Sequence, residues 1–124
     1  MVKLNSTLLS AIGIRSGNSG TSHFREMKIS SVMLLLLTPL FVFTFGSIVG
    51  ESHEDVTAFF AKPFPALICA LTLIVSFAHF KSGAIIAVED YSKGIVAKIL
   101  INCVKALSYS AVAVGLFAIA RMAL

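Results

Sequence analysis

Charged residues are scarce in this chain of 124 residues: Asp, Glu, Lys and Arg make up 13% of it, whereas soluble domains contain about a quarter. Hydrophobic residues make up 57%, and the mean hydropathy is +0.94. A chain this short cannot bury so much apolar surface within itself, because small folds leave a large share of their surface outside. A soluble globular domain is therefore excluded, and lipid is the expected environment of this surface.

Catalytic and metal-binding motifs are also absent. The sequence has no P-loop and no GxSxG, HExxH or GxGxxG motif, so we expect no catalytic residue in this chain. Its two cysteines, Cys69 and Cys103, lie far apart in apolar segments, which argues against a zinc or iron–sulfur site. The net charge of +4 comes from basic residues scattered beside apolar segments, which indicates membrane topology and not nucleic-acid binding.

Three apolar segments are long enough to cross a bilayer. The first, about 29–50, has no charge over 22 residues, which is roughly 33 Å of helix against about 30 Å of hydrocarbon. The others are predicted at about 65–88 and 95–122. The sequence therefore predicts an all-α membrane protein with three transmembrane helices, formed by residues 29–124 and preceded by a polar N-terminal segment, residues 1–28.

Prolines and polar residues mark the ends and a bend of these segments. Pro39 lies in the middle of the first segment and predicts a kink. Residues 51–55 are polar and predict a loop, and Pro63 and Pro65 suit the entry to the second helix. Gly94 suits the turn before the third helix.

Lysine and arginine residues are distributed unevenly about the three segments. Six precede the first segment or lie at the second turn, and two lie on the opposite side: Lys3, Arg15, Arg25, Lys28, Lys93 and Lys98 against Lys62 and Arg121. Basic residues favour the cytoplasmic or matrix side. The N-terminus and the second turn are therefore predicted on that side, and the C-terminus outside.

His79 is the main candidate for a functional residue, because it lies inside the second segment. An ionisable residue at that depth indicates a function, although a neutral histidine hydrogen-bonded to a neighbouring helix is the alternative. Lys81 also lies within this segment. Gly83 follows one turn after His79 and leaves a patch without a side chain, against which a flat macrocycle or another helix can pack.

Asp90 and Tyr91 form a second candidate site at the end of the same segment. Asp90 comes eleven residues after His79, on nearly the same helix face and about 16 Å further along the axis. A carboxylate and a phenol together can hydrogen-bond a polar head group. An ordinary polar turn at a helix end is the alternative.

The positions of the three histidines indicate whether this chain could hold a haem without a partner. A haem with two histidine ligands needs two imidazoles at similar depth, but His23 precedes the first segment and His53 lies in the loop. If His79 ligates haem in this way, another chain must supply the second ligand.

The third segment has a polar face. Lys98, Asn102, Lys105 and Tyr109 follow one another at spacings of four and three. The lysines either extend to the near interface or belong to a polar stripe that faces the bundle.

Several of these residues together resemble a known family. His79-Phe-Lys-Ser-Gly83 followed by Glu89-Asp90-Tyr91 resembles the second helix of the small membrane anchor subunit of succinate dehydrogenase, respiratory complex II. The stretches at 19–30, 39–46 and 62–66 are also similar to alphaproteobacterial and mitochondrial members, and the resemblance covers about residues 16–124.

The resemblance implies cofactors, partners and site residues. His79 would be one axial ligand of haem b, with the second histidine on the larger anchor subunit, and Gly83 would pack against the haem. Tyr91 and Asp90 would form part of the ubiquinone site, and His23 and Lys28 would lie near the haem propionates or the quinone entrance. The chain would anchor a flavoprotein subunit and an iron–sulfur subunit to the bacterial inner or mitochondrial inner membrane, without being catalytic by itself.

Two positions depart from the family pattern. Lys28 stands where the family usually has arginine, so a forked contact becomes a point-charge contact. Ser92-Lys93-Gly94 stands where many relatives have a histidine before the glycine. A fumarate reductase anchor and a non-redox assembly or channel protein remain alternative functions.

Overall fold

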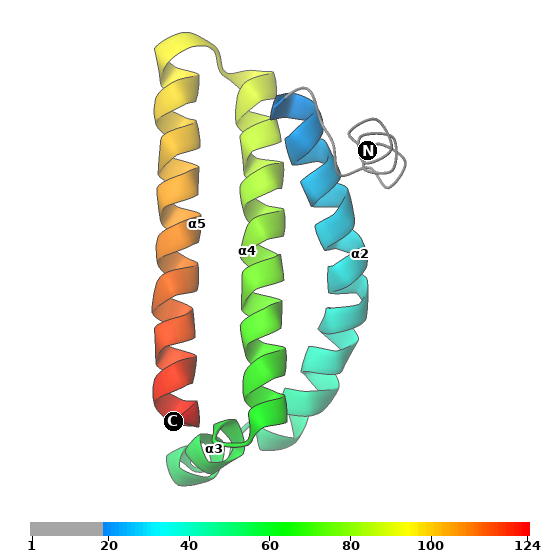
Figure 1. Ribbon diagram of the computed structural model, residues 1–124, viewed down its shortest axis with the longest axis vertical. Coiled ribbons are helices and arrows are strands. Elements are labelled where there is room, and N and C mark those ends of the chain that lie inside the picture. Colours follow the sequence, from blue (N-terminus) through cyan, green and yellow to red (C-terminus); the bar gives the residue numbers. More distant parts are fainter. Residues whose placement is uncertain (1–18) are drawn as a thin grey trace, which may run out of the picture.

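Three long helices form the molecule in the computed structural model, which describes residues 19–124 (Figure 1). They are α2 (Ser19–Phe45), α4 (Pro63–Tyr91) and α5 (Gly94–Ala123). Residues 1–18 of the predicted N-terminal segment lie outside the described residues. All three helices are long and apolar enough to cross a membrane. This confirms the prediction of an all-α membrane protein with three transmembrane helices.

The helices extend beyond the apolar segments from which they were predicted. α2 begins at Ser19, ten residues before the first apolar segment. It ends at Phe45 and continues as one turn of 3₁₀-helix, η1 (Gly46–Ile48). Pro39 lies inside α2 and cannot donate a backbone hydrogen bond to the preceding turn, and α2 is bowed in Figure 1.

The structure contains a short helix, α3 (His53–Phe60), that was not predicted. It occupies much of the connection that was interpreted as a polar loop. Ser52 caps it, because its Oγ accepts a hydrogen bond of 3.1 Å from the Asp55 backbone N–H and donates one of 2.6 Å to Asp55 Oδ2. The polar residues of the loop are thus the cap and first turn of a helix.

Aromatic rings join α3 to the end of α2. Phe45 is 8% exposed, and its ring stacks on Phe60 with centroids 5.1 Å apart. Phe41 and Phe59 also contact Phe45, at 4.7 and 5.8 Å between centroids. Ring pairs at these separations stabilise beyond the area they bury. The cluster therefore holds α3 across the end of the bundle opposite the α4–α5 link.

The link between α4 and α5 is short. Only Ser92 and Lys93 separate the two helices, and Gly94 has a φ of +69°. This left-handed conformation suits glycine, as the predicted turn requires. α4 begins at Pro63. Proline suits this first position, because a backbone N–H there would have no hydrogen-bond partner within the helix.

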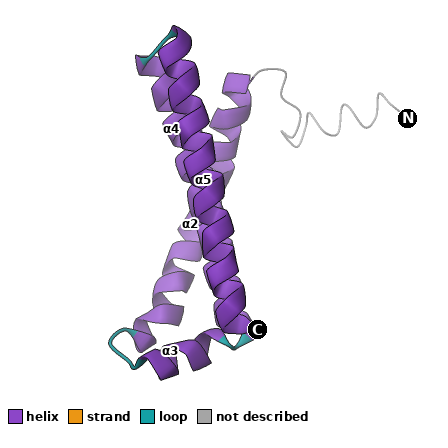
Figure 2. Cartoon of the chain, turned by 90° about the vertical axis from the view of Figure 1, so that its left-hand side faces the viewer, coloured by secondary structure: helices purple, strands orange, loops and turns teal. Residues whose placement is uncertain are grey.

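α4 lies between α2 and α5 and packs against both (Figure 1). Figure 2 shows that α2 is inclined to the α4–α5 pair. Gly115 allows close approach of α5 to α4, because a Cβ there would overlap the Leu73 side chain. Ile85 of α4 is fully buried, whereas Leu35 and Phe43 of α2 are 73% and 84% exposed. Such exposed apolar side chains suit lipid or a partner subunit.

Candidate functional site

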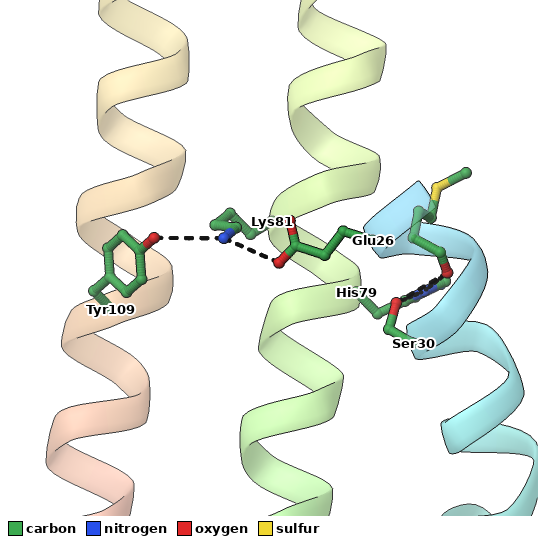
Figure 3. Close-up of polar contacts among 6 residues, drawn as sticks. Glu26, Ser30, His79, Lys81 and Tyr109 are labelled. Carbon is green, nitrogen blue, oxygen red and sulfur yellow. Dashed lines mark hydrogen bonds and ion pairs between the residues drawn. The ribbon is translucent and has the colours of Figure 1, made fainter. Parts of the chain in front are cut away.

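His79 of α4 points toward α2, as Figure 3 shows. Its Nδ1 lies 3.0 Å from Ser30 Oγ, 3.3 Å from the Met27 carbonyl oxygen and 3.4 Å from Ser31 Oγ. All three oxygens belong to one turn of α2. The ring is half-buried, and its orientation therefore depends on the packing of α2 on α4.

The hydrogen bonds around His79 assign its tautomer. The Ser30 and Ser31 hydroxyls both donate to the Met27 carbonyl, at 2.9 and 2.8 Å. With both hydroxyl protons directed to this carbonyl, and because a carbonyl can only accept, the network assigns the proton to Nδ1, which then donates to these oxygens. No hydrogen bond reaches His79 Nε2 within the part of the chain that the structure describes. The lone pair of Nε2 is therefore free to bind a further group.

Gly83 lies on the same side of α4 as His79. A Cβ at Gly83 would be 3.4 Å from Met27 Sδ, so α2 already packs against this glycine. This contact supports the interpretation of Gly83 as a small residue at a helix–helix interface. A role against a macrocycle stays a prediction.

His23 and Lys28 lie on α2 rather than in a segment before it. The His23 Nδ1 atom is buried and has no hydrogen-bond partner among the described residues. A buried polar atom without a partner is costly, and it indicates a group that completes its hydrogen bonding. Lys28 is exposed.

Asp90 and Tyr91 end α4, about 16 Å along the axis from His79. Both side chains are exposed, and Tyr91 is exposed to 90%. The structure therefore does not bring them together with His79. A binding site that includes them must be completed by another molecule.

A second polar group, which the sequence indicated only through Lys81, connects all three helices (Figure 3). Lys81 Nζ of α4 lies 3.2 Å from Glu26 Oε1 of α2 and donates a hydrogen bond of 3.4 Å to the Tyr109 hydroxyl of α5. The ammonium also lies 5.3 Å from the centroid of the Tyr109 ring, which is a cation–π contact. The Lys81 side chain is only 14% exposed, so its charge is compensated within the bundle.

The predicted polar face of α5 divides in the structure. Tyr109 contacts Lys81, whereas Lys98 and Asn102 are exposed and Lys105 is half-buried. The face is thus no continuous stripe toward α4. This arrangement favours lysines that extend to the interface over a polar pore lining.

Ser30, Ser31 and Glu26 were not singled out from the sequence. The signal was present: two adjacent serines open the first apolar segment, and Glu26 is an acidic residue just before it. Neither pattern identifies a partner on another helix. No group of three or more His, Cys, Asp or Glu side chains that could hold a metal ion occurs among the described residues.

Comparisons with known proteins agree with this architecture. The family described as succinate dehydrogenase/fumarate reductase transmembrane subunit matches residues 3–120. The succinate dehydrogenase hydrophobic membrane anchor subunit of Paracoccus denitrificans is 40% identical over 114 residues, covering 92% of this chain and 88% of that protein. No solved structure matches. The predicted resemblance is confirmed, and the chain belongs to the family of transmembrane subunits of succinate dehydrogenase and fumarate reductase.

Proposed function

We propose that this chain is the small membrane anchor of a succinate:ubiquinone oxidoreductase, in which His79 ligates haem b and Asp90 and Tyr91 form part of the ubiquinone site. The observation that supports haem ligation best is the arrangement at His79: Nδ1 faces three oxygens of α2, which assigns it the proton, and Nε2 has no hydrogen-bond partner among the described residues. Metal-ligating histidines bind through one nitrogen while the other donates to a carbonyl or another acceptor. The name of the Paracoccus relative favours succinate dehydrogenase over fumarate reductase.

The donor set of this chain fits a haem shared with a partner. His79 supplies one imidazole, and the remaining described histidines are unsuited as the second axial ligand. His23 lies more than one turn before Ser30, and His53 begins α3 at the other end of the bundle. The second ligand would thus come from the larger anchor subunit. His23, with its unpartnered Nδ1, and Lys28 would lie near the propionates or the quinone entrance.

The candidate residues of this chain have positioning roles in the proposed function. Bound haem would supply one-electron redox chemistry. The α2 oxygens would hold the His79 ring in one tautomer, and the hydrogen bond donated by Nδ1–H would raise the basicity of Nε2 as a ligand. The Tyr91 hydroxyl would donate a hydrogen bond to a quinone carbonyl, and the Asp90 carboxylate beside it would orient that contact or take part in proton supply.

The exposure of Tyr91 is consistent with a site that other subunits complete. In the proposed complex, succinate would be oxidised on a flavoprotein subunit, and electrons would reach quinone through an iron–sulfur subunit. The α4–α5 link and the start of α2 lie at one end of the bundle (Figure 1). The distribution of basic residues orients this end to the cytoplasm or matrix.

A reduced-minus-oxidised optical spectrum of the purified complex tests haem ligation. His79→Leu is expected to lose or shift the b-type haem band, while His53→Leu, an exposed histidine at the opposite end, keeps the wild-type spectrum. An unchanged spectrum of the His79→Leu complex would exclude this residue as a ligand.

A separate assay tests the quinone site. Tyr91→Phe is expected to lower succinate:ubiquinone reductase activity by roughly 10-fold or more, because it removes one hydrogen bond that acts during reduction. Succinate oxidation with an artificial electron acceptor and the haem spectrum should stay at wild-type levels. Equal quinone reductase activity in both proteins would contradict the assignment of Tyr91.

A further inference from the structure

The Glu26–Lys81–Tyr109 group lies at one end of a groove, the end nearer the α4–α5 link, and the proposed function does not use this groove. The groove lies between α4 and α5, and Glu26 of α2 closes its polar end; its other lining residues are Ile74, Phe77, Ala78, Ser108 and Val112. Its cavity volume is about 240 Å³. Whole small-molecule sites have roughly 300–1,000 Å³, so this groove can hold part of a larger molecule whose remainder lies in the bilayer.

The lining of the groove changes from polar to apolar along its length. On α4, the lining changes from Lys81 to Phe77 and Ile74 toward the start of the helix, and on α5 it changes from Tyr109 to Val112 toward the C-terminus. Because α4 and α5 run antiparallel, both helices become apolar toward the same end of the bundle. A ligand for this groove must therefore be polar at one end and apolar along the rest.

The polar end lies at the depth of lipid head groups. From Pro63, the first residue of α4, to Lys81 the helix rises about 27 Å, close to the roughly 30 Å of a hydrocarbon core. Glu26 lies three residues before the charge-free run that begins at Ile29. Both helices thus place the ion pair near the end of the hydrocarbon, and the predicted span 65–88, about 36 Å long, extends beyond it.

Unused hydrogen-bonding capacity faces the groove. The Lys81 ammonium has three donors, of which one reaches Glu26 and one reaches the Tyr109 oxygen. The third N–H and the Tyr109 O–H proton stay available. Ser108 Oγ lines the groove, is buried with 2% exposure of the residue, and has no hydrogen-bond partner among the described residues. An oxyanion at this position would satisfy these donors.

The Glu26 carboxylate determines which phospholipid head groups fit the groove. Glu26 uses Oε1 toward Lys81, and its side chain is 37% exposed. A purely anionic head group would place its phosphate beside this carboxylate, with like charges close together. A head group with both a phosphate and an ammonium can match Lys81 with the one and Glu26 with the other.

We propose that this groove binds one zwitterionic phospholipid of the phosphatidylethanolamine type. The phosphate contacts Lys81, Tyr109 and Ser108, the head-group ammonium contacts Glu26, and one acyl chain lies on Phe77, Ile74 and Val112. His79 and Lys81 are two residues apart on α4 and point to directions about 200° apart. A partner subunit that shares a ligand at His79 therefore leaves the groove open to lipid.

Native mass spectrometry of the intact complex tests this proposal. Complex stripped of lipid in detergent is titrated with phosphatidylethanolamine or with phosphatidylglycerol of the same acyl chains. We expect one tight phosphatidylethanolamine per anchor chain, and at least 10-fold weaker binding in Lys81→Met. Lys98→Met is the matched control, because Lys98 is an exposed lysine of α5 that does not line the groove, and it should bind as the wild type does.

A second variant separates lipid binding from damage to the ion pair. Val112→Phe leaves Glu26, Lys81 and Tyr109 intact but fills the apolar part of the groove, so it should also lose the lipid. Preference for phosphatidylglycerol, equal binding by all variants, or no bound lipid because a partner subunit covers the groove would each overturn the proposal. The haem band, recorded on the same samples, reports on the proposed function independently.

Discussion

Replacement of Ser30 by alanine tests how α2 controls His79, the proposed haem ligand. In the wild type, His79 Nδ1 donates to Ser30 Oγ at 3.0 Å, with the Met27 carbonyl further away at 3.3 Å. Ser30→Ala removes the nearer acceptor and also frees the carbonyl from one of its two hydroxyl donors. The carbonyl then becomes the main acceptor for Nδ1, so the hydrogen bond is weakened but not abolished.

The size of the effect follows from this partial compensation. A neutral hydrogen bond contributes about 1 kcal/mol net, which is a factor of about five in haem affinity. This is less than the 10- to 100-fold usual when the whole partner of a ligating histidine is removed. A weaker bond at Nδ1 makes Nε2 a poorer donor and destabilises ferric haem, so the midpoint potential should rise, by at most about 40 mV for 1 kcal/mol in a one-electron couple.

The assay is a spectroelectrochemical titration of the purified complex, together with haem content after detergent washing. Ser31→Ala is the comparison, because Ser31 Oγ lies 3.4 Å from Nδ1 and its loss should have a smaller effect. A fall in potential, or a larger effect of Ser31→Ala than of Ser30→Ala, would refute the assigned proton position on His79.

Three further predictions concern stability. Gly115→Val should lower the free energy of unfolding of the complex by about 1–3 kcal/mol, because the valine side chain would overlap Leu73. Gly115→Ala should have a smaller effect, since the end of the Leu73 side chain can rotate. Equal melting temperatures of the wild type and both variants would contradict the close approach of α5 to α4. Glu26→Gln should destabilise the complex by about 1 kcal/mol, because it leaves Lys81 without its counter-charge, and adding Lys81→Met should recover part of this loss. A double-mutant cycle of melting temperatures measures the coupling, and strictly additive effects would disprove it. Ser52→Ala removes the cap of α3 and should weaken that helix by about 1 kcal/mol, seen as faster hydrogen exchange at its first-turn amides with unchanged exchange in α4.

The three spans could be predicted because length and lack of charge alone determine them. The charge-free run at 29–50 and the break at 89–94 leave few alternatives for a chain that must lie in lipid. α3 was missed because its cap has the same polar residues as a loop. The sequence signal was Ser52 followed three residues later by Asp55, ahead of a segment with two phenylalanines.

The contacts of the candidate site could not be predicted to the same extent. His79 was identified because a single imidazole in an apolar helix is unusual. Its partners on α2 were not, because the long helices are apolar on all sides and their sequences do not specify which faces meet. The same holds for Lys81, whose partners Glu26 and Tyr109 come from two other helices. The proposed role of Asp90 and Tyr91 requires subunits outside this chain, whose contacts the sequence of one chain does not contain.

The two connections between the long helices differ greatly in length. Two residues join α4 to α5, whereas residues 46–62, with Gly50 at a φ of +89°, separate α2 from α4. The short link allows α4 and α5 to enter the bilayer together as one hairpin, whereas the long connection allows α2 to insert by itself and then pack against α4. A chain divided between Gly50 and Ser52 would keep every long helix whole. Since the oxygens around His79 Nδ1 are all on α2, the imidazole would report whether the two fragments have reassembled.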